Sequence, residues 1–434
     1  MLETLICATG LFCVISLGIA WARYKDVFHP LVIVTPMFAF FYVYMPSRLV
    51  ADGSLYSYAS EDQAAFYQLI VLLALAAFSA GCFKGSSDVH VRSISTFQAS
   101  YDRKKLQNGA YLLGTIGLGC WLQCMGNTGG IANAFSEANA RGWSEFGFVR
   151  EAMYLMIVAQ LLLLSPQGFD LRNKTWWAAV VLFTLPYVLQ GLLGAQRGPT
   201  FLITATLAIS WFLGRRSRPP LLLVLGGGIA LGFLMLFLMT NRSQIHLGSD
   251  FEVKTDVSDF FAASPANEYV FGVGAVATTR QTGQFYWGKR YLAQILVRPI
   301  PRQLWATKYE DFGIAEIERN AGAGVDGMST VMGWEAMTGA AATMVADVWI
   351  EFSWLCIPFL GVLGWIYGYI WRRAIWQGDQ WTTILTIVML LSVYFISQSG
   401  EAVIFRMLIL TVPSSLVWHR ARRSVVDSHA ALAR

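Results

Sequence analysis

Long apolar runs separated by short polar stretches dominate the chain. About 20 mainly apolar residues can cross a membrane as a helix, because unpaired backbone groups are costly in hydrocarbon. Eleven runs approach that length: about 3–22, 30–48, 64–83, 107–125, 151–166, 175–194, 199–214, 219–240, 346–371, 380–398 and 401–418. The pattern therefore predicts an all-α polytopic integral membrane protein with about 11 transmembrane helices.

The positions of these runs predict four parts of the chain. Residues 1–240 would form a bundle of the first eight helices, and residues 346–418 would form the last three. Between them, 241–345 is the one interruption long enough for a small domain. Residues 419–434 remain as a basic tail.

Composition narrows the class of protein. Apolar residues make up 55% of the chain and charged residues 14%, against about 25% charged in an average soluble protein. Mean hydropathy is +0.49. These values exclude a soluble enzyme and a disordered chain, and they do not fit a single anchor carrying a soluble domain.

Basic residues gather in alternate connections between the apolar runs. They are Arg23 and Lys25; Lys84, Arg92, Arg103, Lys104 and Lys105; Arg172 and Lys174; Arg215, Arg216 and Arg218; Arg372 and Arg373; and Arg420, Arg422, Arg423 and Arg434. Because basic loops stay on the cytoplasmic side, we expect an outward N-terminus and a cytoplasmic C-terminus. The segment 241–345 would then lie on the outer face as a loop domain.

Two arginines in the expected outer turns are candidates for binding a phosphate. Arg197 lies in the tight turn Gly194-Ala195-Gln196-Arg197-Gly198-Pro199, where flanking glycines allow a ligand to approach the backbone. Its planar fork of donors suits phosphate or pyrophosphate oxygens. Arg141 follows Gly129-Gly130-Ile131 in another expected outer loop. The alternative is that these arginines contact lipid headgroups at the interface.

The expected outer domain mixes cations with aromatic residues. The cations are Arg280, Lys289, Arg290, Arg298, Arg302, Lys308 and Arg319, and the aromatic residues include Tyr286, Trp287, Trp305 and Tyr309. A site for a charged glycan carrier needs cations for its phosphates and rings for its sugars. A membrane-interface segment has the same composition, so this alternative stays open.

Carboxylates stand at the starts of two expected spans. Asp347 and Glu351 are four residues apart, which places both on one face of a helix. A buried carboxylate there would act as a general base or bind a sugar hydroxyl, although acids also stabilise helix N-termini. Glu401 begins the eleventh span, and Arg406 lies deeper in it, where it needs Glu401 or a ligand phosphate as partner.

Several catalytic motifs are absent from the sequence. There is no Walker A sequence, no HExxH and no nucleophile elbow. Among the cysteines only Cys120 and Cys124 have the spacing of paired metal ligands, and in a membrane helix we expect them to be small core residues. The histidines form no metal cluster. The sequence therefore calls for no nucleotide, metal or nucleic acid.

Taken together, these motifs resemble the Wzy-type O-antigen polymerases, also called oligosaccharide repeat-unit polymerases. The resemblance rests on four stretches: Gly129-Gly130-Ile131 followed by Arg141; Gln196-Arg197-Gly198; Arg298-Pro299-Ile300-Pro301-Arg302-Gln303-Leu304-Trp305 with Lys308; and Asp347 to Glu351 running into Gly361 and Gly364. Arg302 with Gly313 also matches the arginine–glycine spacing of that family's outer loops. Arg197 and Arg141 do not match this spacing, because Ala208 and Ala152 stand where the glycines are expected.

The resemblance implies a GT-C-like glycosyltransferase of the bacterial inner membrane with a periplasmic N-terminus. Such enzymes use neither a metal nor another cofactor. They transfer a growing glycan from undecaprenyl pyrophosphate to a lipid-linked repeat unit on the periplasmic face, for lipopolysaccharide biosynthesis. The implied partners are the undecaprenyl-pyrophosphate-linked oligosaccharide, the lipid bilayer and a co-polymerase that regulates chain length.

The same resemblance suggests a role for each candidate. Arg197, Arg302 and Arg280 would bind the donor pyrophosphate and stabilise the charge of the leaving group. Glu351 or Glu401 would orient or deprotonate the acceptor hydroxyl, and direct displacement would invert the anomeric carbon. The other substrate-binding candidates are Arg141, Lys308, Arg406, Trp305 and Asp347.

Three alternatives remain. An O-antigen ligase would transfer the glycan to lipid A core, and the family's ligases depend on a histidine in the large outer loop, where His246 stands at the very start. A non-enzymatic transporter of lipid-linked glycans would need polar residues along a cavity through many spans. A membrane scaffold would leave the Arg197 turn and Arg406 without a role.

Overall fold

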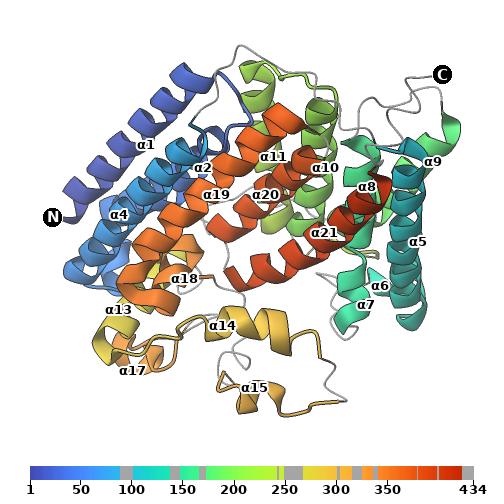
Figure 1. Ribbon diagram of the computed structural model, residues 1–434. Coiled ribbons are helices and arrows are strands. Elements are labelled where there is room, and N and C mark those ends of the chain that lie inside the picture. Colours follow the sequence, from blue (N-terminus) through green and yellow to red (C-terminus); the bar gives the residue numbers. More distant parts are fainter. Residues whose placement is uncertain are drawn as a thin grey trace. The chain divides into compact units, whose positions relative to one another are not determined.

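The structure is a computed structural model. It describes residues 1–87, 101–136, 147–165, 173–241, 244–248, 267–300, 304–314, 325–335, 341–378, 380–397 and 400–422. These residues form helices, with one isolated β-bridge and no sheet among them (Figure 1). The predicted all-α class is confirmed for this part of the chain.

The chain divides into two compact units. The first comprises Met1–Arg92, Ser258–Arg372 and Leu391–Arg406. Its elements are α1 (Leu2–Tyr24), α2 (Pro30–Ala39), the π-helix η1 (Phe40–Tyr44), α3 (Met45–Ala51), the 3-10 helix η2 (Ser54–Ser57), α4 (Glu61–Gly85), α13 (Glu268–Thr282), α14 (Lys289–Leu292), the π-helix η4 (Ala293–Val297), α15 (Lys308–Asp311), α17 (Met328–Met332), α18 (Thr343–Phe352) and the 3-10 helix η5 (Ser353–Leu355).

The second unit comprises Ser93–Val257, Arg373–Leu390 and Met407–Arg434. Its helices are α5 (Arg103–Asn127), α6 (Ile131–Ala134), α7 (Gly147–Ala152), α8 (Leu155–Leu164), α9 (Lys174–Leu192), α10 (Arg197–Gly214) and α11 (Leu221–Thr240). Three further helices supply residues to both units: α19 (Cys356–Gln377), α20 (Gln380–Ser397) and α21 (Gly400–Ala421).

Seven helical segments among the described residues are long and apolar enough to cross a membrane. They are Leu2–Tyr24, Pro30–Ala51, Glu61–Ser86, Lys174–Leu192, Leu221–Leu238, Thr343–Gln377 and Gln380–Ser397. The chain is therefore a multi-pass membrane protein. The four other predicted spans fall on α8, which has 10 residues, and on α5, α10 and α21, where charged and polar residues dilute the apolar run.

The ninth predicted span is broken rather than continuous. It was expected at about 346–371, but α18 ends at Phe352 and α19 begins at Cys356. Between them Ser353 has φ 52° and ψ −136°. Pro358 gives a reason, because its ring would clash with the carbonyl of Trp354 in a continuous helix, whereas the first turn of α19 tolerates it.

Glycines bring α4 and α19 into close contact. A Cβ built on Gly81 would lie 1.9 Å from the carbonyl oxygen of Gly361, and one on Gly364 would lie 2.0 Å from that of Phe78. Small residues let membrane helices approach at the backbone, where packing replaces the hydrophobic effect as the driving force. These glycines hold α19, and with it the broken span, against α4.

The expected outer loop contains a buried helix. Residues Tyr269 to Thr279 of α13 are all buried, and α13 packs against α18, α4 and α17. At 15 residues the helix is shorter than a span, so hydropathy alone assigned it to the loop. The outer domain expected at 241–345 stays a prediction.

Candidate functional site

A buried arginine joins the two carboxylates that the sequence placed on one helix face. Arg290 at the start of α14 is 2% exposed, and Asp347 and Glu351 of α18 are 0% exposed. Its Nη2 lies 2.9 Å from Asp347 Oδ1, and its Nε lies 3.5 Å from Glu351 Oε1. Buried charges are costly even when they are paired, and within membrane spans they commonly mark functional sites. We call these three residues the ionic cluster.

Asp347 connects three elements of the first unit. Besides the bond from Arg290, its Oδ2 accepts hydrogen bonds from the Tyr291 hydroxyl at 2.5 Å and from the Gly400 amide at 2.8 Å. Burial, followed by the charge of Asp347, raises the pKa of Tyr291, so its hydroxyl remains a donor. Asp347 thus fixes α14 and the first residue of α21 to α18.

Glu351 is held by the segment that precedes α14. Its Oε2 accepts a 2.7 Å hydrogen bond from the Gly288 amide. Its own carbonyl accepts from the Trp287 amide at 2.8 Å, and the Ile350 carbonyl accepts from the Tyr286 amide at 3.1 Å. Because the last carbonyls of a helix lack partners within it, residues 286–288 complete the end of α18 and cover the Glu351 carboxylate.

The other end of α18 is anchored by tyrosines. The Tyr42 hydroxyl accepts a 3.2 Å hydrogen bond from the Val345 amide, and the Tyr67 hydroxyl lies 2.9 Å from Thr343 Oγ1. Both tyrosines are fully buried. The short helix that carries the two carboxylates of the ionic cluster is therefore fixed at both ends by side chains or backbone from other elements.

Backbone strain gathers around the same helix. Thr343 has φ 61°, Ser353 has φ 52° and Trp287 has φ 54°. Positive φ is uncommon outside glycine, and in β-branched or bulky residues it costs of order 1–3 kcal/mol. Strain of this kind concentrates at functional sites, so the three residues add to the case that the ionic cluster is one.

A group of aromatic rings lies beside α18. Phe66, Phe285, Trp287, Trp349 and Trp354 contact one another through ring centroids 5.2 to 6.1 Å apart. Trp287 is 59% exposed and Trp354 is 50% exposed. We call these five rings the aromatic platform. Exposed rings of this type stack on sugar faces or sit at a membrane interface.

The predicted substrate residue Arg280 lies on this platform. Its Cζ is 3.9 Å from the Phe66 ring centroid. Phe66 in turn contacts Trp349, which stands two residues before Glu351 and donates from Nε1 to Thr279 Oγ1 at 3.0 Å. The structure therefore brings Arg280, Asp347 and Glu351 into one region of the first unit.

Lys308 and Trp305 have structural partners in this unit. The buried Lys308 ammonium donates to the carbonyls of Val297 at 3.1 Å, Arg298 at 3.4 Å and Ile300 at 2.5 Å. An ammonium has three donors, and these bonds use them to hold the end of η4. Trp305 Nε1 donates to Asp311 Oδ2 at 2.6 Å. That bond is the main cause of the lowered pKa of Asp311.

Arg406 lies against a ring. Its Cζ is 4.4 Å from the centroid of Tyr394, so an aromatic face is one partner of this partly buried cation, for which the sequence predicted Glu401 or a phosphate. Glu401 is in α21, but its side chain is outside the described residues. The neighbouring Phe405 ring lies 4.2 Å from Arg298 Cζ.

Arg197 belongs to the second unit, as the exposed first residue of α10. Ala195 in the same turn has φ 47°, which is also uncommon for a residue with a side chain. The first amides of a helix attract anions, and an arginine beside them adds to that attraction. Arg141 and Arg302 are outside the described residues.

Arg290 and Tyr291 were not among the site residues predicted from the sequence. Arg290 was one of seven cations in the expected loop, and nothing in its neighbours distinguished it. The sequence indicated only that some cation should lie near the carboxylates, because a carboxylate pair inside a span requires a cation nearby. Gly288 and Gly400 bind the carboxylates through their backbone amides. The sequence does not indicate this role, because every residue except proline has a backbone amide.

Within the described residues, no three side chains of His, Cys, Asp or Glu lie close enough to hold a metal ion. Comparison of the chain with protein families, with curated proteins and with solved structures finds no match.

Proposed function

We propose that this protein is a glycosyltransferase that polymerises lipid-linked oligosaccharide repeat units in the bacterial inner membrane. It has eleven spans and a GT-C-like architecture, with the N-terminus on the periplasmic side and the C-terminus in the cytoplasm. It acts on the periplasmic face on glycans carried by undecaprenyl pyrophosphate. A co-polymerase is a candidate partner for setting chain length.

One observation carries this proposal. Glu351, a carboxylate held by Arg290 and the Gly288 amide, lies beside aromatic rings that carry Arg280. In glycosyl transfer a carboxylate can take the proton of the acceptor hydroxyl, a cation can stabilise the leaving phosphate, and aromatic rings can stack on sugars. The resemblance to the repeat-unit polymerases supplies the substrate class.

The proposed chemistry is a single displacement. The acceptor hydroxyl oxygen attacks the anomeric carbon of the donor sugar, its proton passes to Glu351, and the bond from that carbon to the pyrophosphate oxygen breaks with inversion. Arg280 stabilises the charge on the departing pyrophosphate. Arg197 and Arg302 are the other arginines that the resemblance assigns to pyrophosphate binding. Because Glu351 is 0% exposed, the segment 286–288 that covers it has to move before the hydroxyl can reach its carboxylate.

The test is polymerisation by the purified protein in nanodiscs. A synthetic undecaprenyl-pyrophosphate repeat unit without nucleotide is expected to yield a ladder of products on a gel. Glu351→Gln and Arg197→Ala are expected to abolish the ladder, whereas Glu335→Gln and Arg48→Ala, at exposed positions, are expected to keep it. A ladder that survives both site variants contradicts the assigned roles, and transfer only to added lipid A core indicates a ligase.

A second candidate function is transport of a lipid-linked glycan. The observation that favours it is the ionic cluster on a broken span, since discontinuous helices with buried charges line the sites of many transporters. Flipping of a fluorescent lipid-linked oligosaccharide across a proteoliposome membrane, without a polymer ladder, would favour the transporter.

A further inference from the structure

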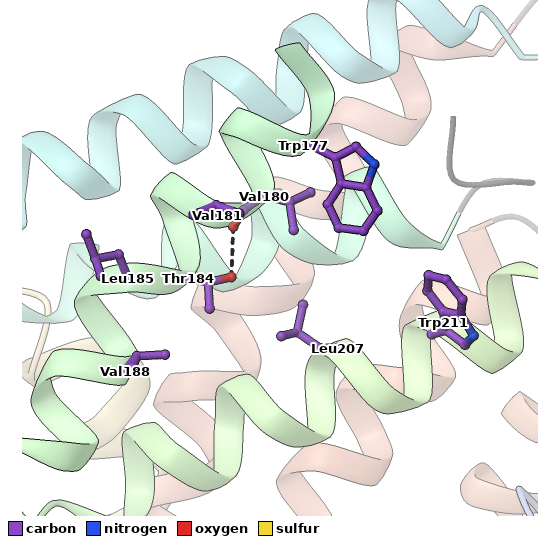
Figure 2. A pocket seen from close by; sticks show the side chains of 8 residues that line it. All are labelled: Trp177, Val180, Val181, Thr184, Leu185, Val188, Leu207 and Trp211. Atoms are coloured by element: carbon purple, nitrogen blue, oxygen red, sulfur yellow. Dashed lines mark hydrogen bonds between the residues drawn. The ribbon is translucent and has the colours of Figure 1, made fainter. Parts of the chain in front are cut away.

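An apolar groove runs between α9 and α10 in the second unit. Its volume is about 390 Å³, and its walls are almost entirely apolar. Figure 2 shows the residues that face one another across it, among them Trp177, Val181, Leu185 and Val188 of α9 and Leu207 and Trp211 of α10. The volume lies in the range of small-molecule and cofactor sites.

The Thr184 hydroxyl in the wall is already bonded. Thr184 Oγ1 donates to the Val180 carbonyl at 2.8 Å (Figure 2), and it accepts from Gln160 Nε2 at 2.9 Å. On the open side Val181 is 60% exposed and Leu185 is 46% exposed. Apart from the Thr184 hydroxyl and the indole N–H groups of Trp177 and Trp211, the lining side chains are hydrocarbon, so the groove suits a hydrocarbon chain.

The length of the groove fits one leaflet of a bilayer. Trp177 and Val188 are eleven residues apart on α9, which corresponds to about 16 Å along a helix. That is roughly half of the ~30 Å hydrocarbon core. A lipid acyl chain has this reach, whereas a spanning helix of a partner would continue beyond both ends.

One end of the groove carries charge. Trp177 and Trp211 lie toward that end (Figure 2), and Arg215 Cζ is 3.6 Å from the Trp211 ring centroid. Arg216 and Arg218 follow in the chain, and Lys174 begins α9. Tryptophan and arginine in this order mark the headgroup level of a membrane, and a stacked guanidinium still directs donors along its edge toward phosphate oxygens.

We infer that the groove binds one acyl chain of an anionic phospholipid, with the lipid phosphate at Arg215. The inference does not depend on the proposed function. The positive-inside rule places the basic end in the cytoplasmic leaflet, where anionic headgroups favour nearby arginine.

Native mass spectrometry of the detergent-purified protein tests this site. Phosphatidylglycerol and phosphatidylcholine with identical chains are added in equal amounts, and we expect one phosphatidylglycerol to be retained preferentially. Arg215→Gln should reduce that preference about fivefold. Arg23→Gln is the matched control, because Arg23 is also an exposed arginine near a ring, with Cζ 5.5 Å from the Tyr24 centroid, and it lies in the first unit.

A second variant tests the groove itself. Leu207→Trp fills it and should lower retention of both lipids, whereas Leu182→Trp, at an exposed position of α9 outside the groove, should not. Equal retention of the two lipids by the unmodified protein would overturn the headgroup assignment. Unchanged retention in both Arg215→Gln and Leu207→Trp, or preferential retention of undecaprenyl phosphate, would overturn the phospholipid site.

Discussion

The Gly400 amide donates a 2.8 Å hydrogen bond to Asp347 Oδ2, which fixes the first residue of α21 to the middle of α18. A side chain at position 400 would obstruct this contact, because a Cβ there would lie 2.8 Å from the same oxygen. Since the Tyr291 hydroxyl shares that oxygen, one carboxylate positions two elements around the ionic cluster.

Asp347→Asn should therefore destabilise the fold strongly. The change leaves Arg290 without its closest counter-charge, and breaking a buried ion pair costs about 3–5 kcal/mol. Thermal unfolding in detergent, followed by circular dichroism, measures the loss. Asp52→Asn is the control, because its 3.8 Å pair with Arg48 is exposed and is worth less than about 1 kcal/mol. Equal effects of the two changes would argue against a structural role for Asp347.

The sequence predicted the two carboxylates of the ionic cluster. It did not predict which cation pairs with them. Helical spacing placed Asp347 and Glu351 on one face, and hydropathy located most spans. Periodicity carries no information on which distant cation meets a carboxylate pair, so Arg290 could not be separated from the other loop cations. The burial of α13 was missed because a helix shorter than a membrane span does not stand out by hydropathy.

Arg290 and Glu351 should show energetic coupling. Arg290→Met leaves two buried carboxylates without their cation and should be severely destabilising. Glu351→Gln removes the charge of one of these two carboxylates and leaves Arg290 paired with Asp347. The double variant should be more stable than the sum of the single losses predicts, by at least about 1 kcal/mol. A double-mutant cycle on thermal unfolding measures this coupling, and strict additivity would mean that the 3.5 Å contact contributes nothing.

The contact between α4 and α19 predicts that a side chain at Gly364 lowers stability, and Gly18 in α1 provides the control. Gly364→Ala should destabilise the protein, because the new Cβ would lie 2.0 Å from the Phe78 carbonyl oxygen. Gly18→Ala in α1 meets nothing within 4 Å and should be neutral or stabilising by up to about 1 kcal/mol, since alanine is the better helix former. The melting temperatures of both variants measure these effects. An unchanged melting temperature for Gly364→Ala would contradict the close approach of α4 and α19.

His29 predicts a loss of stability in acid. Burial lowers its pKa to about 3. Its Nδ1 accepts from the Leu31 amide, and its Nε2 lies 3.0 Å from Ser86 Oγ, so the folded state holds the neutral ring. The unfolded chain takes up a proton below about pH 6.5. The stabilisation is therefore complete above that pH and is lost as pH falls toward 3, by roughly 2 kcal/mol at pH 5.

His29→Asn is the variant that isolates this titration. Asparagine can still cap the start of α2 but has no proton to gain. Unfolding free energies at pH 7, 6 and 5 should fall more steeply for the unmodified protein than for the variant. Parallel curves would show that another group controls the acid response.

Lys308 offers a choice between a structural and a substrate-binding role. Lys308→Met removes three hydrogen bonds to buried or partly buried carbonyls and should cost about 2–3 kcal/mol of stability. Lys289→Met, at an exposed position of the same unit, should change it by less than about 0.5 kcal/mol. Thermal unfolding of both variants in detergent separates the two readings. Lys308→Met could instead keep its stability and lose affinity for a lipid-linked pyrophosphate. That result would support the substrate-binding role expected from the sequence, and it would show that the bonds to the end of η4 are not needed for stability.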